Sequence, residues 1–148
     1  IDILGDIGPR AASAAGILVS YAYQAEPNIR RYALEALGLV ISHDAEIEQT
    51  FLDALSAGLL DEDAIARRNA TFAIARLGER ANNPETVQRV SDNLYHWHHH
   101  VRGWSIEALL RFQDAQAMKS ALSYLSSARW DEMPKSGDRP PTPTPMRS

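Results

Sequence analysis

A ten-residue stretch occurs three times in this chain, at residues 29–38, 66–75 and 101–110. Residues 4–8 match the last part of a fourth copy. Equivalent aliphatic positions mark the repeat, with steps of 33, 37 and 35 residues: Leu4, Leu37, Ile74 and Leu109. A drifting period in this range is typical of helical-repeat arrays, in which each unit buries its apolar face only against its neighbours. The repeat therefore predicts architecture much more strongly than it predicts activity.

Apolar residues spaced three and four apart predict a series of helices joined by short connections. No segment shows the alternation of a strand. Residues 42–44 offer an N-cap for the third helix, and a fifth helix is expected to begin at residues 82–84. The six helices besides the fifth are expected at about residues 9–25, 28–41, 45–60, 61–78, 99–112 and 114–128. Short connections between helices favour antiparallel hairpins, so the predicted class is all-α.

The periodicity also predicts which side chains are buried. Three equivalent positions carry small residues where neighbouring helices are expected to approach closely: Ala33, Ala70 and Ser105. Larger apolar residues are expected on the buried faces of the first, second and seventh helices: Ile17, Leu18, Tyr21, Ile29, Leu37, Val40, Met118, Leu122 and Leu125.

Each copy carries an arginine at the edge of its apolar stripe: Arg30, Arg67 and Arg102. Glu26 precedes the first of these arginines by four residues, and Asp63 precedes the second by four. An acid placed one turn before a base stabilises a helix by about 0.3–0.5 kcal/mol. We therefore interpret these arginines as structural and expect two ion pairs within single helices.

The repeated stretch resembles the second helix of HEAT repeats, especially the short bacterial form seen in phycobilisome-lyase-type repeat proteins. The first copy matches the pattern at every position: Ile29, Arg30, Ala33, Ala36, Leu37 and Gly38. The second copy has Ala75 in place of the first glycine, and the third has Ser105 in place of alanine and lacks the glycines. This resemblance implies a right-handed α–α superhelix of about 3.5 helical hairpins over residues 1–128. It says little about activity, because the family consists mostly of binding scaffolds with a few enzymes.

The chain divides into that repeat domain and a proline-rich tail at residues 129–148. Five of the eight prolines lie in this tail, which is expected to be flexible, with a polyproline-type docking peptide as the alternative. The first residues fall within the second half of a repeat. We therefore expect the chain to be part of a longer repeat protein.

In the resembling family the second helices line a concave surface. Helical geometry then places a set of arginine and aromatic residues on the exposed arc, opposite the buried one. Asn69 falls on the same arc. The predicted binding residues are Arg31, Tyr32, Glu35, Arg68, Phe72, Arg76, Trp104 and Arg111. Arginine and aromatic residues dominate binding energy at interfaces. Packing of the aromatic residues beneath a neighbouring segment, and simple solvation of the arginines, are the alternatives.

We expect a non-enzymatic scaffold with a protein partner and no cofactor, since no catalytic motif is present. Nucleic-acid binding through the arginines is the alternative, and a net charge of −4 argues against it. A chromophore-lyase role is a third reading, taken from the resemblance. No apolar run approaches the roughly 20 residues that span a bilayer, so a cytoplasmic protein is expected. The histidine-rich run 96–100 has an i,i+4 spacing but falls between two helices, which favours a polar loop over a metal site.

Overall fold

The computed structural model describes residues 9–44 and 46–128 of the chain. Over these residues the backbone forms seven α-helices and one short 3₁₀ helix, and no strand. The elements are α1 (Pro9–Ala22), α2 (Pro27–Ile41), α3 (Gln49–Gly58), α4 (Ala64–Leu77), η1 (Gly78–Ala81), α5 (Pro84–Asn93), α6 (His99–Arg111) and α7 (Ala115–Ala128). The predicted all-α class is confirmed. Predictions for residues 1–8 and for the proline-rich tail lie outside the described residues.

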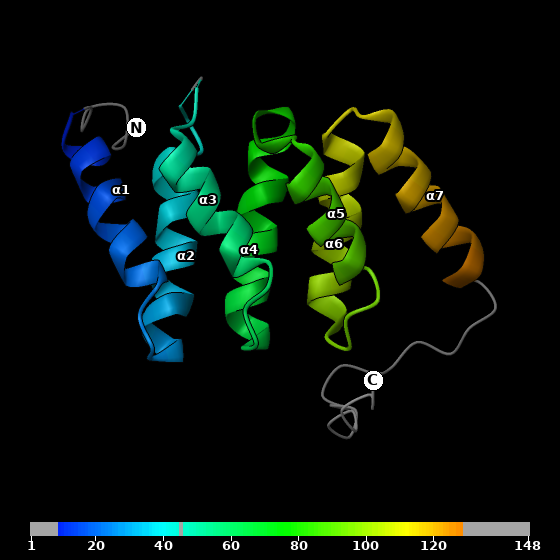
Figure 1. Ribbon diagram of the computed structural model, residues 1–148, viewed down its shortest axis with the longest axis horizontal. Coiled ribbons are helices and arrows are strands. Elements are labelled where there is room, and N and C mark those ends of the chain that lie inside the picture. The colour runs from blue at the N-terminus through cyan, green and yellow to red at the C-terminus, as the bar shows by residue number, and fades with distance from the viewer. Residues whose placement is uncertain (1–8, 45, 129–148) are drawn as a thin grey trace, which may run out of the picture.

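The helices pack as neighbouring pairs along the long axis of the molecule (Figure 1). The three helices of the repeated stretch, α2, α4 and α6, lie side by side in that order. The other helices cover them, with α1 and α3 against α2, α3 also against α4, and α5 and α7 against α6. Within the described part of the chain, none of the helices combines the length and apolar character needed to cross a bilayer.

Polar side chains define where several helices begin. Glu26, Asp63 and Asn83 each accept a hydrogen bond from a backbone N–H two or three residues later, at the starts of α2, α4 and α5. Such bonds satisfy N–H groups that have no partner within the helix. At the other end of α4, Gly78 has φ of 57°, a conformation in which glycine has no steric penalty. The chain can therefore turn sharply into η1 and α5.

Small residues allow α2, α3 and α4 to approach closely. A Cβ added at Gly38 of α2 would lie 2.5 Å from the Cβ of Ala73 in α4. A Cβ added at Gly58 of α3 would lie 2.7 Å from the Cβ of Ala70. The three small residues predicted at close approaches, Ala33, Ala70 and Ser105, are all buried. The Ser105 hydroxyl donates to the Val101 carbonyl at 2.6 Å, so its polar group is satisfied inside the core.

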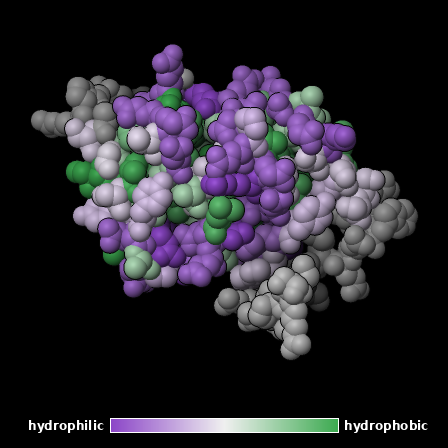
Figure 2. Space-filling view, in the orientation of Figure 1, coloured by the Kyte–Doolittle hydropathy of each residue, from purple (hydrophilic) through white to green (hydrophobic). Residues whose placement is uncertain are grey.

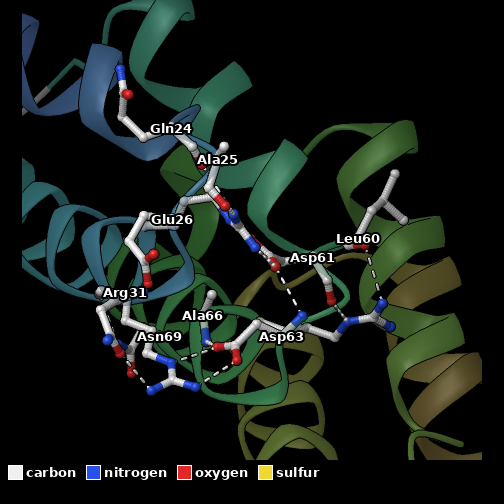
Figure 3. Close-up of polar contacts among 12 residues, drawn as sticks. Gln24, Ala25, Glu26, Arg31, Leu60, Asp61, Asp63, Ala66 and Asn69 are labelled. Atoms are coloured by element: carbon white, nitrogen blue, oxygen red, sulfur yellow. Dashed lines mark hydrogen bonds and ion pairs between the residues drawn. The ribbon is translucent and has the colours of Figure 1, made fainter.

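The three repeat arginines secure the connections that precede their own helices, and Figure 3 shows the first two of these connections, at Gln24–Ala25 and at Leu60–Asp61. Each guanidinium donates to two backbone carbonyls five to seven residues earlier in the chain. The carbonyls belong to Gln24 and Ala25 for Arg30, to Leu60 and Asp61 for Arg67, and to His96 and Trp97 for Arg102. The structural interpretation of these arginines agrees with their contacts.

Two of the arginines also connect one helical pair to the next. Arg30 forms an ion pair with Asp61, and Arg67 donates to the Asn93 side chain at 3.1 Å. The predicted ion pairs within single helices are therefore wrong. Glu26 and Asp63 instead cap the starts of α2 and α4, which leaves both arginines to reach across to the following connection.

Three helix boundaries differ from the prediction by three residues or more, and one of them is the start of α4, which lies at Ala64 rather than at residue 61. α1 ends at Ala22 rather than at residue 25, and the next carbonyls, at residues 24 and 25, accept from Arg30. α3 begins at Gln49 rather than at residue 45. The expected cap does not form, because Ser42 donates back to Leu39 and the carbonyls of residues 42 and 44 accept from Arg80.

Several side chains predicted to be buried are exposed, and all of them lie on α2 or on the first and last of the described helices, α1 and α7. Ile29 is 41% exposed, although Leu37 is fully buried as predicted. The other residues that were predicted to be buried and are exposed are Ile17 and Tyr21 on α1 and Met118, Leu122 and Leu125 on α7. The face drawn in Figure 2 is mostly hydrophilic, broken by separate hydrophobic patches. Helical periodicity identifies an apolar face, but only a neighbouring helix buries it.

Candidate interaction surface

The predicted binding residues separate into two groups, which lie on different helices and differ in their contacts. Arg68, Phe72 and Arg76 follow one another at four-residue intervals along α4, so they share one helical face. Trp104 and Arg111 lie on the adjacent helix α6. The other three, Arg31, Tyr32 and Glu35, lie on α2.

Two aromatic rings join α4 to α6. The rings of Phe72 and Trp104 lie 4.7 Å apart between centroids and are inclined by 70°, an edge-to-face contact. Both side chains are partly buried, and Trp104 also packs against the hydrophobic core. Such a contact contributes about 0.5–1.5 kcal/mol beyond the buried area. The two residues are therefore part of the packing between the helices and still keep one side toward solvent.

Cations flank this aromatic pair at the C-terminal ends of both helices. The Arg76 guanidinium carbon lies 5.8 Å from the centroid of the Phe72 ring, within cation–π range, and Arg76 is exposed. On α6, Arg111 pairs with Glu107 at 2.8 Å between Nε and Oε1. It also donates to the Ala75 carbonyl of α4 at 3.4 Å, which brings the ends of the two helices together.

An arginine and two histidines lie at the N-terminal ends of the same helices. Arg68 donates to the side-chain oxygen of its neighbour Asn69 at 3.1 and 3.2 Å and has no ion pair with any described carboxylate. His98 and His100, at the start of α6, have lowered pKa values. Partial burial is the main cause in both, and the charge of Arg68 contributes. The lowered pKa values favour the neutral form of both imidazoles, so Arg68 is the cation among these three side chains.

We name this surface of α4 and α6 the cation–aromatic face. It comprises Arg68, Phe72, Arg76, His100, Trp104 and Arg111. A shallow cavity of about 290 Å³ opens beside Trp104 and is also lined by His99, His100, Gly103 and Glu107. The predicted residues of α4 and α6 thus form one continuous patch. Helical spacing also places His100 on the predicted exposed arc, but the predicted binding residues did not include it.

The residues predicted on α2 do not join that patch. Arg31 makes two short hydrogen bonds to Asp63, of 2.6 and 2.7 Å, and a third to Asn28. The Arg31 guanidinium holds the pKa of the Asp63 carboxyl below its usual value. Arg31 is therefore engaged in linking α2 to α4, rather than solvated as its placement on the exposed arc predicted. Tyr32 and Glu35 are exposed, Tyr32 by 72%.

Asn69 is a further correction to the predicted exposed arc. It is buried, and its amide donates to the Arg31 carbonyl at 2.9 Å, so it connects α4 to α2. The equivalent position on α2 is Tyr32, which lines an apolar groove of about 380 Å³ together with Leu18, Tyr21, Ile29, Ala33 and Ala36. This groove was missed by the sequence reasoning. Larger apolar residues in the first copy, at positions that are small or polar in the second, were the available signal.

The histidine run lies at the junction between α5 and α6, as predicted, with His99 and His100 forming the first residues of α6. His96 and His98 each accept a backbone hydrogen bond from the residue two positions later, so both rings serve local turns. Among the described residues, no group of three or more His, Cys, Asp or Glu side chains is arranged to hold a metal ion.

Comparisons with protein-family profiles, with curated proteins and with solved structures found no match to this chain.

Proposed function

We propose that this chain is a HEAT-like helical-repeat scaffold that binds a protein partner through the cation–aromatic face. The observation that supports this most directly is the placement of the Phe72–Trp104 pair between cations on two adjacent helices. Arginine and large aromatic residues are the side chains that most often carry binding energy at protein interfaces. Repeat proteins present such residues on a rigid row of helices, so little ordering is needed on binding.

The superhelical arrangement is part of the proposal. Three features favour it: the repeated stretch, the consecutive packing of α2, α4 and α6, and the arginine contacts between successive pairs. Nucleic-acid binding through the same arginines is less well supported, because the carboxylates of Glu35 and Glu107 lie on the same row of helices.

Charge reversal on the face tests the proposal. The double variant Arg68→Glu with Arg76→Glu should fold normally by circular dichroism, because neither arginine has an ion-pair partner among the described residues. The immobilised wild-type chain should retain one particular protein partner, and the immobilised double variant should not retain that partner. Lys119→Glu, at an exposed position of α7, is the matched control and should retain it. Equal retention by all three proteins would place the binding surface elsewhere.

A further inference from the structure

The cation–aromatic face has a charge pattern that specifies its partner more closely. Arg68 and Arg76 lie eight residues apart on α4, with Phe72 halfway between them. At a rise of 1.5 Å per residue, the two arginines are separated by about 12 Å along the helix axis. The face therefore presents positive charge, then an aromatic group, then positive charge, in order along one side of the helix.

The adjacent helix places basic side chains on both sides of its own ring. On α6, His100 precedes Trp104 and Arg111 follows it. The pKa of His100 is lowered and Arg111 is paired with Glu107, so among the described residues of this face the uncompensated positive charge is that of α4. Contacts fix the alignment of the two rows, since Phe72 touches Trp104 in the middle and Arg111 reaches the Ala75 carbonyl at one end. The two helices together form a band rather than a single line of side chains.

The positive charge on α4 is not neutralised within the described part of the chain. Arg68 contacts only the Asn69 amide oxygen, and Arg76 contacts the Phe72 ring and receives a weak bond from Arg80 at its carbonyl. By contrast, Arg30 and Arg31, also on the row of repeat helices, are each bound by an aspartate. A carboxylate from outside the chain is the group that complements Arg68 and Arg76.

Resting on the proposed function, we propose that the partner is an extended acidic segment of the form acidic–x–apolar–x–acidic. In an extended chain, alternate side chains point the same way and residues rise about 3.3 Å each. Two acidic side chains four positions apart therefore lie about 13 Å apart on one side, with the apolar side chain between them. This spacing matches the two arginines and places the apolar group over the Phe72–Trp104 pair.

The test uses synthetic peptides and fluorescence anisotropy. The probe is a fluorescein-labelled peptide with the core Glu-Ser-Phe-Ser-Glu, compared with Lys-Ser-Phe-Ser-Lys and with the rearranged core Glu-Glu-Ser-Ser-Phe. Wild type should bind the first peptide at least tenfold more tightly than either other peptide. The variant Arg68→Glu with Arg76→Glu should lose at least tenfold in affinity for it, and Lys119→Glu should stay within twofold of wild type.

Four outcomes would overturn the inference: no binding of the acidic peptide at 1 mM protein, equal binding of the lysine peptide, no effect of the arginine reversal, or tighter binding of an oligothymidylate through the same arginines. The retention experiment described for the proposed function distinguishes a failure of the acidic-segment inference from a failure of the scaffold proposal. If retention still depends on Arg68 and Arg76 while the acidic peptide does not bind, the acidic-segment inference fails and the scaffold stands. If retention does not depend on them either, both fail.

Discussion

Arg30 and Asp61 belong to different helical pairs and meet in a two-pronged ion pair, with Nε–Oδ2 and Nη2–Oδ1 distances of 2.8 and 3.0 Å. Their side chains are only 13% and 7% exposed. The contact joins the start of α2 to the connection before α4, over 31 residues of sequence. Because Arg30 also donates to two carbonyls of its own connection, one guanidinium fastens two consecutive connections together.

The first prediction concerns the strength of this link. A double-mutant cycle with Arg30→Gln and Asp61→Asn should give a coupling free energy of about 1.5–3 kcal/mol in urea unfolding, because the pair is bidentate and largely shielded from solvent. The exposed pair Arg111–Glu107 is the control and should give at most about 0.5 kcal/mol. Equal coupling in the two cycles would mean that burial adds nothing at Arg30.

The second prediction concerns the close approach of α2 and α4. Gly38→Ala should lower the free energy of unfolding by about 1–3 kcal/mol, since the new methyl group meets the Ala73 Cβ. Gly103→Ala is the matched control, because nothing lies within 4 Å of its added Cβ. That change should raise the free energy by about 0.5–1 kcal/mol through helix propensity. Adding Ala73→Gly to Gly38→Ala should restore part of the loss, and a failure to do so would assign the effect to another contact.

The sequence predicted the helices, their small contact residues and the structural role of the repeat arginines, because each of these depends on local spacing. It did not predict that Arg30 pairs with Asp61, since helical spacing describes contacts within one helix. The exposure of Ile29 was missed for a related reason. The equivalent residues Ala66 and Val101 are fully buried, and they lie on α4 and α6, each of which packs against the preceding repeat helix. Periodicity does not show which helix has such a neighbour.

The candidate site was predicted only in part, again because helical spacing does not describe contacts between helices. Considering each helix alone placed Phe72 and Trp104 on exposed arcs, and the packing of α4 against α6 then brought the two rings into contact. Arg31 shared the same predicted exposure, and Asp63 of the next pair engages it. Residues on one helical face thus differ in whether they are free to bind a partner, because the adjacent helical pair contacts some of them and not others.

The third prediction concerns the connection from α6 to α7. Gln113 has φ of 52°, the left-handed conformation that costs a residue with a Cβ about 1–2 kcal/mol. Gln113→Gly should therefore raise the free energy of unfolding by about 0.5–1 kcal/mol. Gln113→Ala, which keeps the Cβ, should leave the stability nearly unchanged in the same urea titration. If alanine stabilises as much as glycine, backbone strain is not the cause.

The fourth prediction concerns the pH dependence of stability. The pKa of His96 is lowered to about 4, mainly by burial, with the charges of Arg67, His98 and Arg102 acting in the same direction. The unfolded chain keeps a histidine pKa near 6.5, so between about pH 6.5 and pH 4 the unfolded state binds more protons than the folded state. The free energy of unfolding should therefore be constant above pH 7 and fall as the pH drops through this window.

The size of the effect and its source can be measured together. After allowing for partial exposure of the ring, the loss attributable to His96 should be about 1–2 kcal/mol. His96→Asn removes the titrating group and supplies a side-chain oxygen that can accept from the His98 N–H in place of Nδ1. Urea unfolding from pH 7.5 to 5 should show a smaller loss in this variant than in wild type, since most carboxylates titrate below that range. Parallel curves for the two proteins would assign the acid sensitivity to other groups, with His98 and His100 the next to substitute because their pKa values are lowered as well.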